Sequence, residues 1–104
     1  MRTILLSALL ALAASHAAAA DDAVPELAKA NGCTSCHAAH EKIVGPAFQS
    51  VAAKYAADKD AVATLVQSIK GGSTGKWGRA AMPAHNSLSA ADAKALATWV
   101  LATK

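Results

Sequence analysis

The sequence predicts a small all-α domain of about four short helices. Four segments carry the periodicity of a helix, and none alternates apolar and polar residues over the length of a strand. The chain has 104 residues, which is enough for one domain at most. Its aromatic residues are two tryptophans, one tyrosine and one phenylalanine, so the helices can bury only a small core by themselves.

The first twenty residues have the order of a secretory signal peptide. A single positive charge, Arg2, precedes an apolar run, and small side chains follow up to the Ala18-x-Ala20 pattern. An uncleaved membrane anchor is the alternative, but the run is shorter than the about 20 apolar residues that span a bilayer. We therefore expect residues 1–20 to be cleaved before Asp21, leaving residues 21–104 as an exported domain.

The mature domain is mildly basic. Removal of Arg2 lowers the number of lysines and arginines from ten to nine, against seven acidic residues, which gives a formal net charge of +2. The basic residues form no run and are little interleaved with aromatic ones, so nucleic-acid binding is not supported. We expect no nucleic-acid partner and no stable membrane association.

The first two predicted helices are short. The first covers about residues 24–31, with Pro25 in its first turn, where the missing N–H is not needed, and Gly32 as its stop. The second lies in the segment PAFQSVAAKYA, residues 46–56. Its apolar face is formed by residues at helical spacing: Phe48, Val51, Ala52 and Tyr55.

The third predicted helix begins after Asp60, a suitable N-cap residue, and ends at the two glycines 71–72. Its apolar face has the same spacing: Val62, Leu65, Val66 and Ile69. The fourth begins after Ser89, with Asp92 where the acid of a capping box would lie. One face of this last helix carries Leu96, Trp99 and Val100.

A loop of eighteen residues, GGSTGKWGRAAMPAHNSL, joins the third and fourth helices. Loops longer than about 12–15 residues in a compact domain are usually functional or disordered. This loop carries several side chains suited to a site: Trp77, Met82, Pro83, His85 and Asn86. We therefore expect it to belong to a functional site.

Both cysteines of the chain lie in the segment NGCTSCH, where Cys33 and Cys36 are followed at once by His37. C-x-x-C-H is the attachment sequence of c-type haem. Two thiols at this spacing can add to the two vinyl groups of the porphyrin, and the histidine can then ligate the iron. A covalently bound haem would also supply the large apolar body that this small core lacks. The motif predicts one haem c, with His37 as the proximal ligand.

Three other uses of the cysteines compete with this interpretation. A thioredoxin-like redox pair belongs to a βαβ context, and no strand is predicted here. A zinc site would use Cys33, Cys36, His37 and His40, but these residues lie closer together than the usual ligand pairs. A disulfide between the two cysteines would close a very small loop and leave the small core unexplained.

Met82 is the predicted sixth ligand of the iron. It is the one methionine of residues 21–104, and Pro83 favours an extended backbone at Met82, which suits a side chain that projects from a loop. Histidine and methionine ligation is the cytochrome c pattern and raises the reduction potential. His85 is the competing ligand and His40 a more distant one, while a lone methionine is often only a core residue.

Residues 21–104 resemble a class I c-type cytochrome, of the small monohaem kind found in the periplasm of denitrifying and related bacteria (the cytochrome c five-fifty-one/five-fifty-two group). The resemblance rests on the segments NGCTSCHAAHEKIVGPAF, VAAKYA, IKGGSTGKWG, AMPAH and ATWVLATK. It implies the small cytochrome c fold, with about four short helices around one covalently bound haem and a long Met-bearing loop. It also implies that the Pro46 carbonyl accepts a hydrogen bond from His37 Nδ1, and that the Trp77 indole N–H reaches a haem propionate.

The segment after Met82 departs from the family pattern. MPAHNSLS holds one residue more than is usual, and the asparagine that hydrogen-bonds the methionine sulfur in the family corresponds to Asn86 here. Ala81 replaces a proline that is common before the methionine, which makes the loop less rigid.

The resemblance implies a soluble periplasmic electron carrier and not an enzyme. Its partners would be redox proteins, such as periplasmic reductases or oxidases and a membrane-bound cytochrome donor, which a monomer meets in weak contacts. Lys42, Lys76 and Arg79 are candidate charges around the exposed haem edge. The alternative is a haem protein with a labile sixth site that acts as a gas sensor or peroxidase, which the extra loop residue and His85 would favour.

Overall fold

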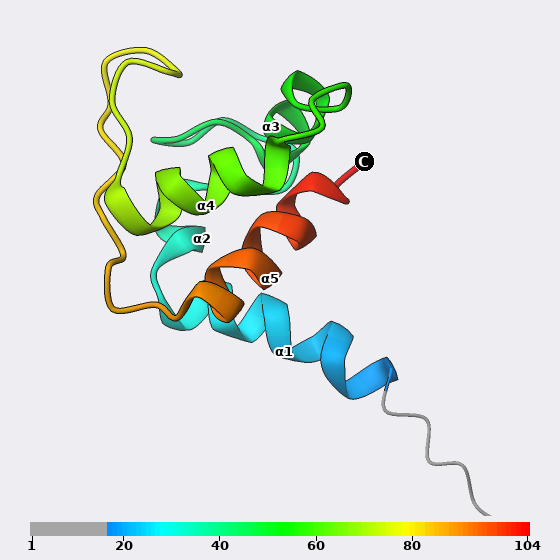
Figure 1. The fold of residues 1–104 in the computed structure, drawn as a ribbon. Helices are drawn as coiled ribbons and strands as arrows, with labels where there is room; N and C mark the ends of the chain where they lie inside the picture. The colour runs from blue at the N-terminus through cyan, green and yellow to red at the C-terminus, as the bar shows by residue number, and fades with distance from the viewer. Residues whose placement is uncertain (1–16) are drawn as a thin grey trace, which may run out of the picture.

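The computed structural model describes residues 17–104, with side chains from Ala23 onward. Residues 1–16 lie outside the described residues, so the signal peptide and its cleavage before Asp21 remain predictions. The described chain forms five helices: α1 (Ala17–Ala30), α2 (Cys33–Cys36), α3 (Phe48–Lys54), α4 (Ala61–Gly71) and α5 (Ala90–Leu101) (Figure 1). Residues 17–104 contain no β-strand and only two isolated β-bridges, which confirms the all-α prediction.

The last helix, α5, holds the other helices together. It contacts α1, α3 and α4, and Figure 1 shows it between α1 on one side and α4 on the other. Ala93 and Ala97 of α5 have no exposed surface, and such small side chains allow neighbouring helices to approach closely. The alanine content that makes the core small therefore also makes this close packing possible.

The first helix is longer than predicted. It begins at Ala17 and not near residue 24, so Pro25 lies inside the helix and its predicted place in the first turn was wrong. Alanines 17–20 have the highest helix propensity of all residues, and they extend the helix toward the N-terminus. Neither α1 nor any other described helix combines the length and the apolar character needed to cross a membrane.

The two predicted N-caps behave differently. Ser89 caps α5 as predicted, since its hydroxyl oxygen accepts the N–H of Asp92 at 3.0 Å. Asp60 occupies the predicted N-cap position of α4, but its side chain makes no capping hydrogen bond. Asp58, two residues earlier, instead accepts the backbone N–H of Asp60 at 2.8 Å, in the local turn that aspartate commonly forms.

The buried apolar residues form two clusters and not one continuous core. The first consists of Ala28, Leu88 and Leu96, with the partly buried Trp99 packed against it. The second consists of Val51, Leu65 and Ala97. Helix α5 supplies residues to both clusters, and Ile69 of α4 packs against both.

The long loop after α4 returns to its own start. Ser73 and Met82 form a β-bridge with two backbone hydrogen bonds, of 3.0 Å and 2.8 Å. The preceding Gly72 has φ of 79° and ψ of 173°, a conformation found almost only in glycine. A Cβ atom there would lie 2.8 Å from the Met82 carbonyl oxygen, so Gly72 allows the two ends of the loop to meet.

The cap of α5 can be tested by the variant Ser89→Ala. The Asp92 N–H then loses its acceptor at the helix start, and we expect the free energy of unfolding to fall by about 0.5–2 kcal/mol. Denaturant unfolding followed by far-ultraviolet circular dichroism measures this change. Ser87→Ala, an exposed serine just outside the helix, is the control and should change stability by less than about 0.5 kcal/mol. Equal effects in both variants would contradict the capping role.

The two neighbouring glycines 71 and 72 provide a matched test of the loop closure. Gly72→Ala forces a side chain into a glycine conformation and against Met82, so we expect a loss of about 1–3 kcal/mol in unfolding free energy. Gly71→Ala adds a Cβ atom with no neighbour within 4 Å at a helical position, so it should be neutral or slightly stabilising. The same denaturation measurement compares them, and a neutral Gly72→Ala would contradict this account.

Candidate functional site

A cavity of about 360 Å³ opens between the helices and the long loop. Its walls are mostly apolar and include Ala28, Phe48, Leu65, Ile69, Leu96 and Val100. Six of the seven predicted site residues line it: Cys33, Cys36, His37, Pro46, Trp77 and Met82. The seventh, Asn86, is exposed and does not line the cavity, because the chain turns there between His85 and Leu88. Its contact with the Met82 sulfur remains a prediction.

The two cysteines lie at the ends of α2, a single helical turn that was not predicted as a separate helix. Gly32, with φ of 74°, makes the sharp change of direction between α1 and this turn. Both thiols are half-buried and unbonded to each other. Burial raises the pKa of the Cys33 thiol, and the neighbouring Cys36 raises it further. Both cysteines line the cavity, so their two sulfur atoms reach it from one helical turn.

The ring of His37 is held on several sides. Its Nδ1 lies 2.7 Å from the Pro46 carbonyl oxygen, the hydrogen bond that the resemblance implies. Because a carbonyl can only accept, Nδ1 carries the proton and Nε2 has a free lone pair for a metal. The Phe48 ring stacks on the imidazole, with centroids 5.1 Å apart and 21° between planes. A Cβ atom on Gly45 would lie 2.5 Å from His37 Cε1, so the backbone also packs against the ring.

Both candidate sixth ligands lie in the cavity wall. Met82 is fixed by its two hydrogen bonds to Ser73, and its side chain is partly buried. His85 is also partly buried, and its N–H donates to the Ile69 carbonyl at the end of α4 at 2.8 Å. The structure thus brings both residues to the cavity, and their positions alone do not decide which of them is the sixth ligand.

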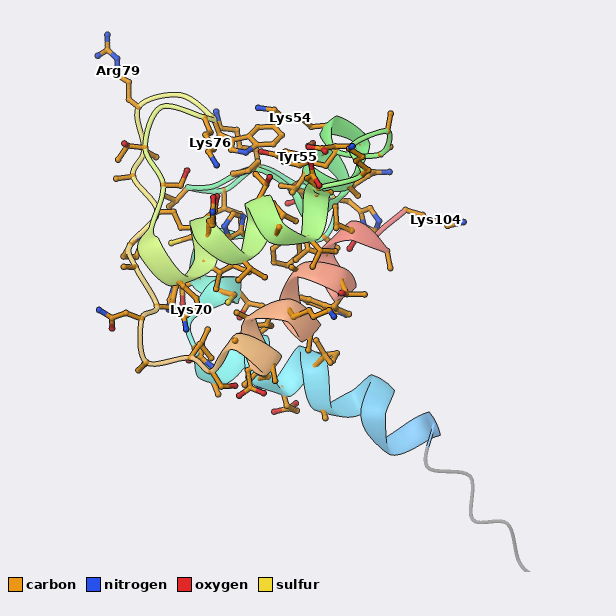
Figure 2. The ribbon with its side chains drawn as sticks, viewed as in Figure 1. Lys54, Tyr55, Lys70, Lys76, Arg79 and Lys104 are labelled. Atoms are coloured by element: carbon orange, nitrogen blue, oxygen red, sulfur yellow. The ribbon has the colours of Figure 1, made fainter. Side chains whose placement is uncertain are left out.

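Two lysines, Lys54 and Lys76, lie beside Trp77, a residue of the cavity wall. Both lysines are labelled in Figure 2. The Lys54 ammonium lies 4.6 Å from the centre of a Trp77 ring, within reach of a cation–π interaction. The Lys76 ammonium donates to the Ser68 hydroxyl oxygen at 2.9 Å. Ser68 was missed because it lies inside a helix read only for its apolar residues. Its place three residues after Leu65, on the inner face of α4, was the available signal.

The rival uses of the cysteines find less support in the geometry. His40 Nε2 lies 2.8 Å from the Lys104 carbonyl oxygen, so this histidine is engaged with the end of the chain and not with the cysteines. Within residues 17–104 no group of three or more histidine, cysteine or acidic side chains is placed to hold a metal ion. No strand of a βαβ unit occurs in the same residues.

The residues around the cavity fit haem c. Two thiols, one imidazole with a free Nε2 and one thioether reach a mainly apolar space, which suits a large apolar ring with iron at its centre. These residues would hold the group through two thioether bonds and two axial ligands. The hydrogen bond from His37 to Pro46 would orient the first of those ligands.

Comparison with known proteins agrees with this fit. Residues 22–104 match the family described as Cytochrome c. Cytochrome c-552 of Nitrosomonas europaea is 52% identical over 79 residues, which cover 76% of this chain and 77% of the relative. Cytochrome c-551 of Pseudomonas denitrificans is 51% identical over 79 residues, which cover 76% and 95%.

Solved structures extend the similarity to the fold. The crystal structure of wild-type Nitrosomonas europaea cytochrome c552 superposes with a TM-score of 0.74 at 51% identity, over 77% of this chain and 99% of that one. The class 1 cytochrome MtoD of Sideroxydans lithotrophicus ES-1 gives a TM-score of 0.70 at 29% identity, over 80% and 95%. This chain therefore belongs to the cytochrome c family, as a small class I monohaem cytochrome with one haem c bound covalently through Cys33 and Cys36.

Proposed function

We propose that this electron-transfer cytochrome works in the periplasm with His37 and Met82 as the axial ligands of its iron. The observation that carries the proposal is that both side chains line one cavity, while Pro46 occupies His37 Nδ1 and leaves Nε2 for the metal. The haem supplies the chemistry, a reversible one-electron change between Fe(II) and Fe(III). The protein holds both ligands and keeps most of the surroundings apolar.

Met82 is held in place by the loop, and the chemistry of its thioether favours it over His85. Two backbone hydrogen bonds to Ser73 and the close approach of Gly72 fix the Met82 backbone, so little order has to be gained when its sulfur binds iron. A thioether ligand also raises the reduction potential, as an electron carrier in a respiratory chain requires. With both axial positions filled, no substrate site remains on the iron, and the protein acts as a carrier and not as an enzyme.

Partner proteins would meet the haem at an apolar edge. Ile43 and Val44 are 52% and 53% exposed, and Val44 also lines the cavity. Lys42 and Arg79 are exposed charges that could border this edge. A monomer presenting a small patch of this kind fits weak, short-lived contacts with periplasmic reductases or oxidases and with a membrane-bound cytochrome donor.

One alternative function has a specific observation in its favour. His85 lines the same cavity as Met82, so the iron could exchange one ligand for the other or leave the sixth position open. Such a protein would bind a small gas or react with peroxide. Binding of carbon monoxide to the reduced wild-type protein separates the two functions, because six-coordinate iron with a firmly bound methionine does not respond to it.

The variant Met82→Ala tests the sixth ligand. Loss of the thioether should abolish the near-infrared sulfur-to-iron band of the ferric protein and allow carbon monoxide to bind the ferrous one. The reduction potential should fall substantially, because the axial ligands set the potential of haem over a range of about 0.8 V. His85→Ala is the matched control and should keep the wild-type spectrum and potential. The reverse pattern, with Met82→Ala unchanged and His85→Ala altered, would assign the ligand to His85.

The double variant Cys33→Ala, Cys36→Ala tests the structural need for the cofactor. Without covalent attachment only axial ligation and apolar contacts retain the occupant of the cavity of about 360 Å³, and a domain of this size has little stability to spare. We expect the chain to lose most of its helical circular dichroism and its cooperative thermal transition. Met82→Ala keeps the attachment and should stay helical. A stable, helical double variant would show that the helices fold without haem.

A further inference from the structure

The Lys76 ammonium has an unusual place for a surface cation. The residue lies on the long loop and is exposed, yet its Nζ reaches Ser68 Oγ at 2.9 Å. Ser68 retains only 9% of its surface and lies on the inner face of α4. Both residues line the cavity. The charged end of Lys76 therefore turns inward, while its neighbour Arg79 projects away from the tip of the loop (Figure 2).

This cation has no anion beside it in the described chain. Lys76 is the one lysine or arginine among the described residues that line the cavity, and no aspartate or glutamate is among them. An ammonium held at the edge of a mainly apolar cavity attracts an anion there more strongly than it would in open water. The expected partner is then part of the group that fills the cavity.

The occupant brings the matching chemistry. Haem is apolar over most of its ring, but it carries two propionate carboxylates, which the apolar walls cannot accept. Trp77, whose indole N–H the resemblance directs to a propionate, lies next to Lys76 and lines the same end of the cavity. An N–H donor and an ammonium at one place form a suitable site for one carboxylate.

The surrounding contacts keep this end in place. Lys54 lies over the Trp77 ring, and its ammonium reaches the Lys76 carbonyl oxygen at 3.5 Å. The Ser68 oxygen accepts one Lys76 N–H, so its own O–H remains available to donate. The long loop, α3 and α4 thus all contribute contacts around Lys76 and Trp77.

We propose that Lys76, oriented by Ser68, binds a haem propionate and raises the reduction potential of the iron. The proposal rests on the proposed electron-carrier function and adds a residue that tunes it. A fixed positive charge near the haem stabilises the reduced state, which carries one positive charge less than the oxidised state. It also offsets the negative charge of the carboxylate. Both effects act in the direction of a higher potential.

The test measures the midpoint potential of purified haem-loaded variants without any partner protein. Lys76→Gln removes the charge and should lower the potential. Lys76→Arg keeps it and should restore most of the wild-type value. Ser68→Ala frees the ammonium and should give an intermediate shift. Arg79→Gln removes one positive charge from the same loop outside the cavity and should have the smallest effect.

A structural readout accompanies the potential. In the reduced wild-type protein, nuclear Overhauser effects should connect the propionate methylene protons with the Lys76 side chain, and Ser68→Ala should weaken them. A Lys76→Gln shift no larger than that of Arg79→Gln, or the absence of these effects, would overturn the assignment. The sulfur-to-iron band of each variant is recorded in parallel. Its absence in the wild type would defeat the proposed ligation, whereas the comparison of potentials would still decide the role of Lys76.

Discussion

The apolar cavity is the feature on which the arrangement of the helices depends. The buried residues divide into two clusters, one around Leu96 and one around Val51 and Leu65, and members of both face the cavity. The covalently bound haem would thus lie against both clusters and join them, and neither cluster is large by itself. This explains how so short a chain, with so many alanines, reaches a defined fold.

The sequence predicted the parts of the structure that local chemistry determines. Apolar spacing located four of the helices. The Ser89 cap and the C-x-x-C-H segment could be recognised in the sequence because each depends on a few neighbouring residues. The error at Pro25 also has a local origin, since the alanine run before it extends the helix toward the N-terminus. Contacts between distant segments could not be read in this way.

Ser68 illustrates that limit. Helical periodicity assigns it to an inner face, but only the folded chain shows that a lysine from a loop eight residues later donates to its hydroxyl. The stacking of Phe48 on His37 is similar, because Phe48 was predicted only as an apolar helix residue. In both cases a residue inside a predicted helix makes a contact toward the site that helical spacing does not reveal. The binding roles of the seven predicted site residues were accessible through the motif and the resemblance. Haem attachment through Cys33 and Cys36 follows from the family to which the chain belongs, and the roles of the other five residues remain predictions.

The position of α5 has a consequence for the motions of the protein. This helix contacts α1, α3 and α4, and it supplies Leu96, Trp99 and Val100 to the cavity wall. The wall cannot open at this side without the separation of α5 from its neighbours, so solvent access to the haem is coupled to partial unfolding of the domain. Amide protons of α5 should then be among the slowest of the chain to exchange with water. The time for which the haem stays shielded from solvent is then set by how long α5 remains packed on its neighbours.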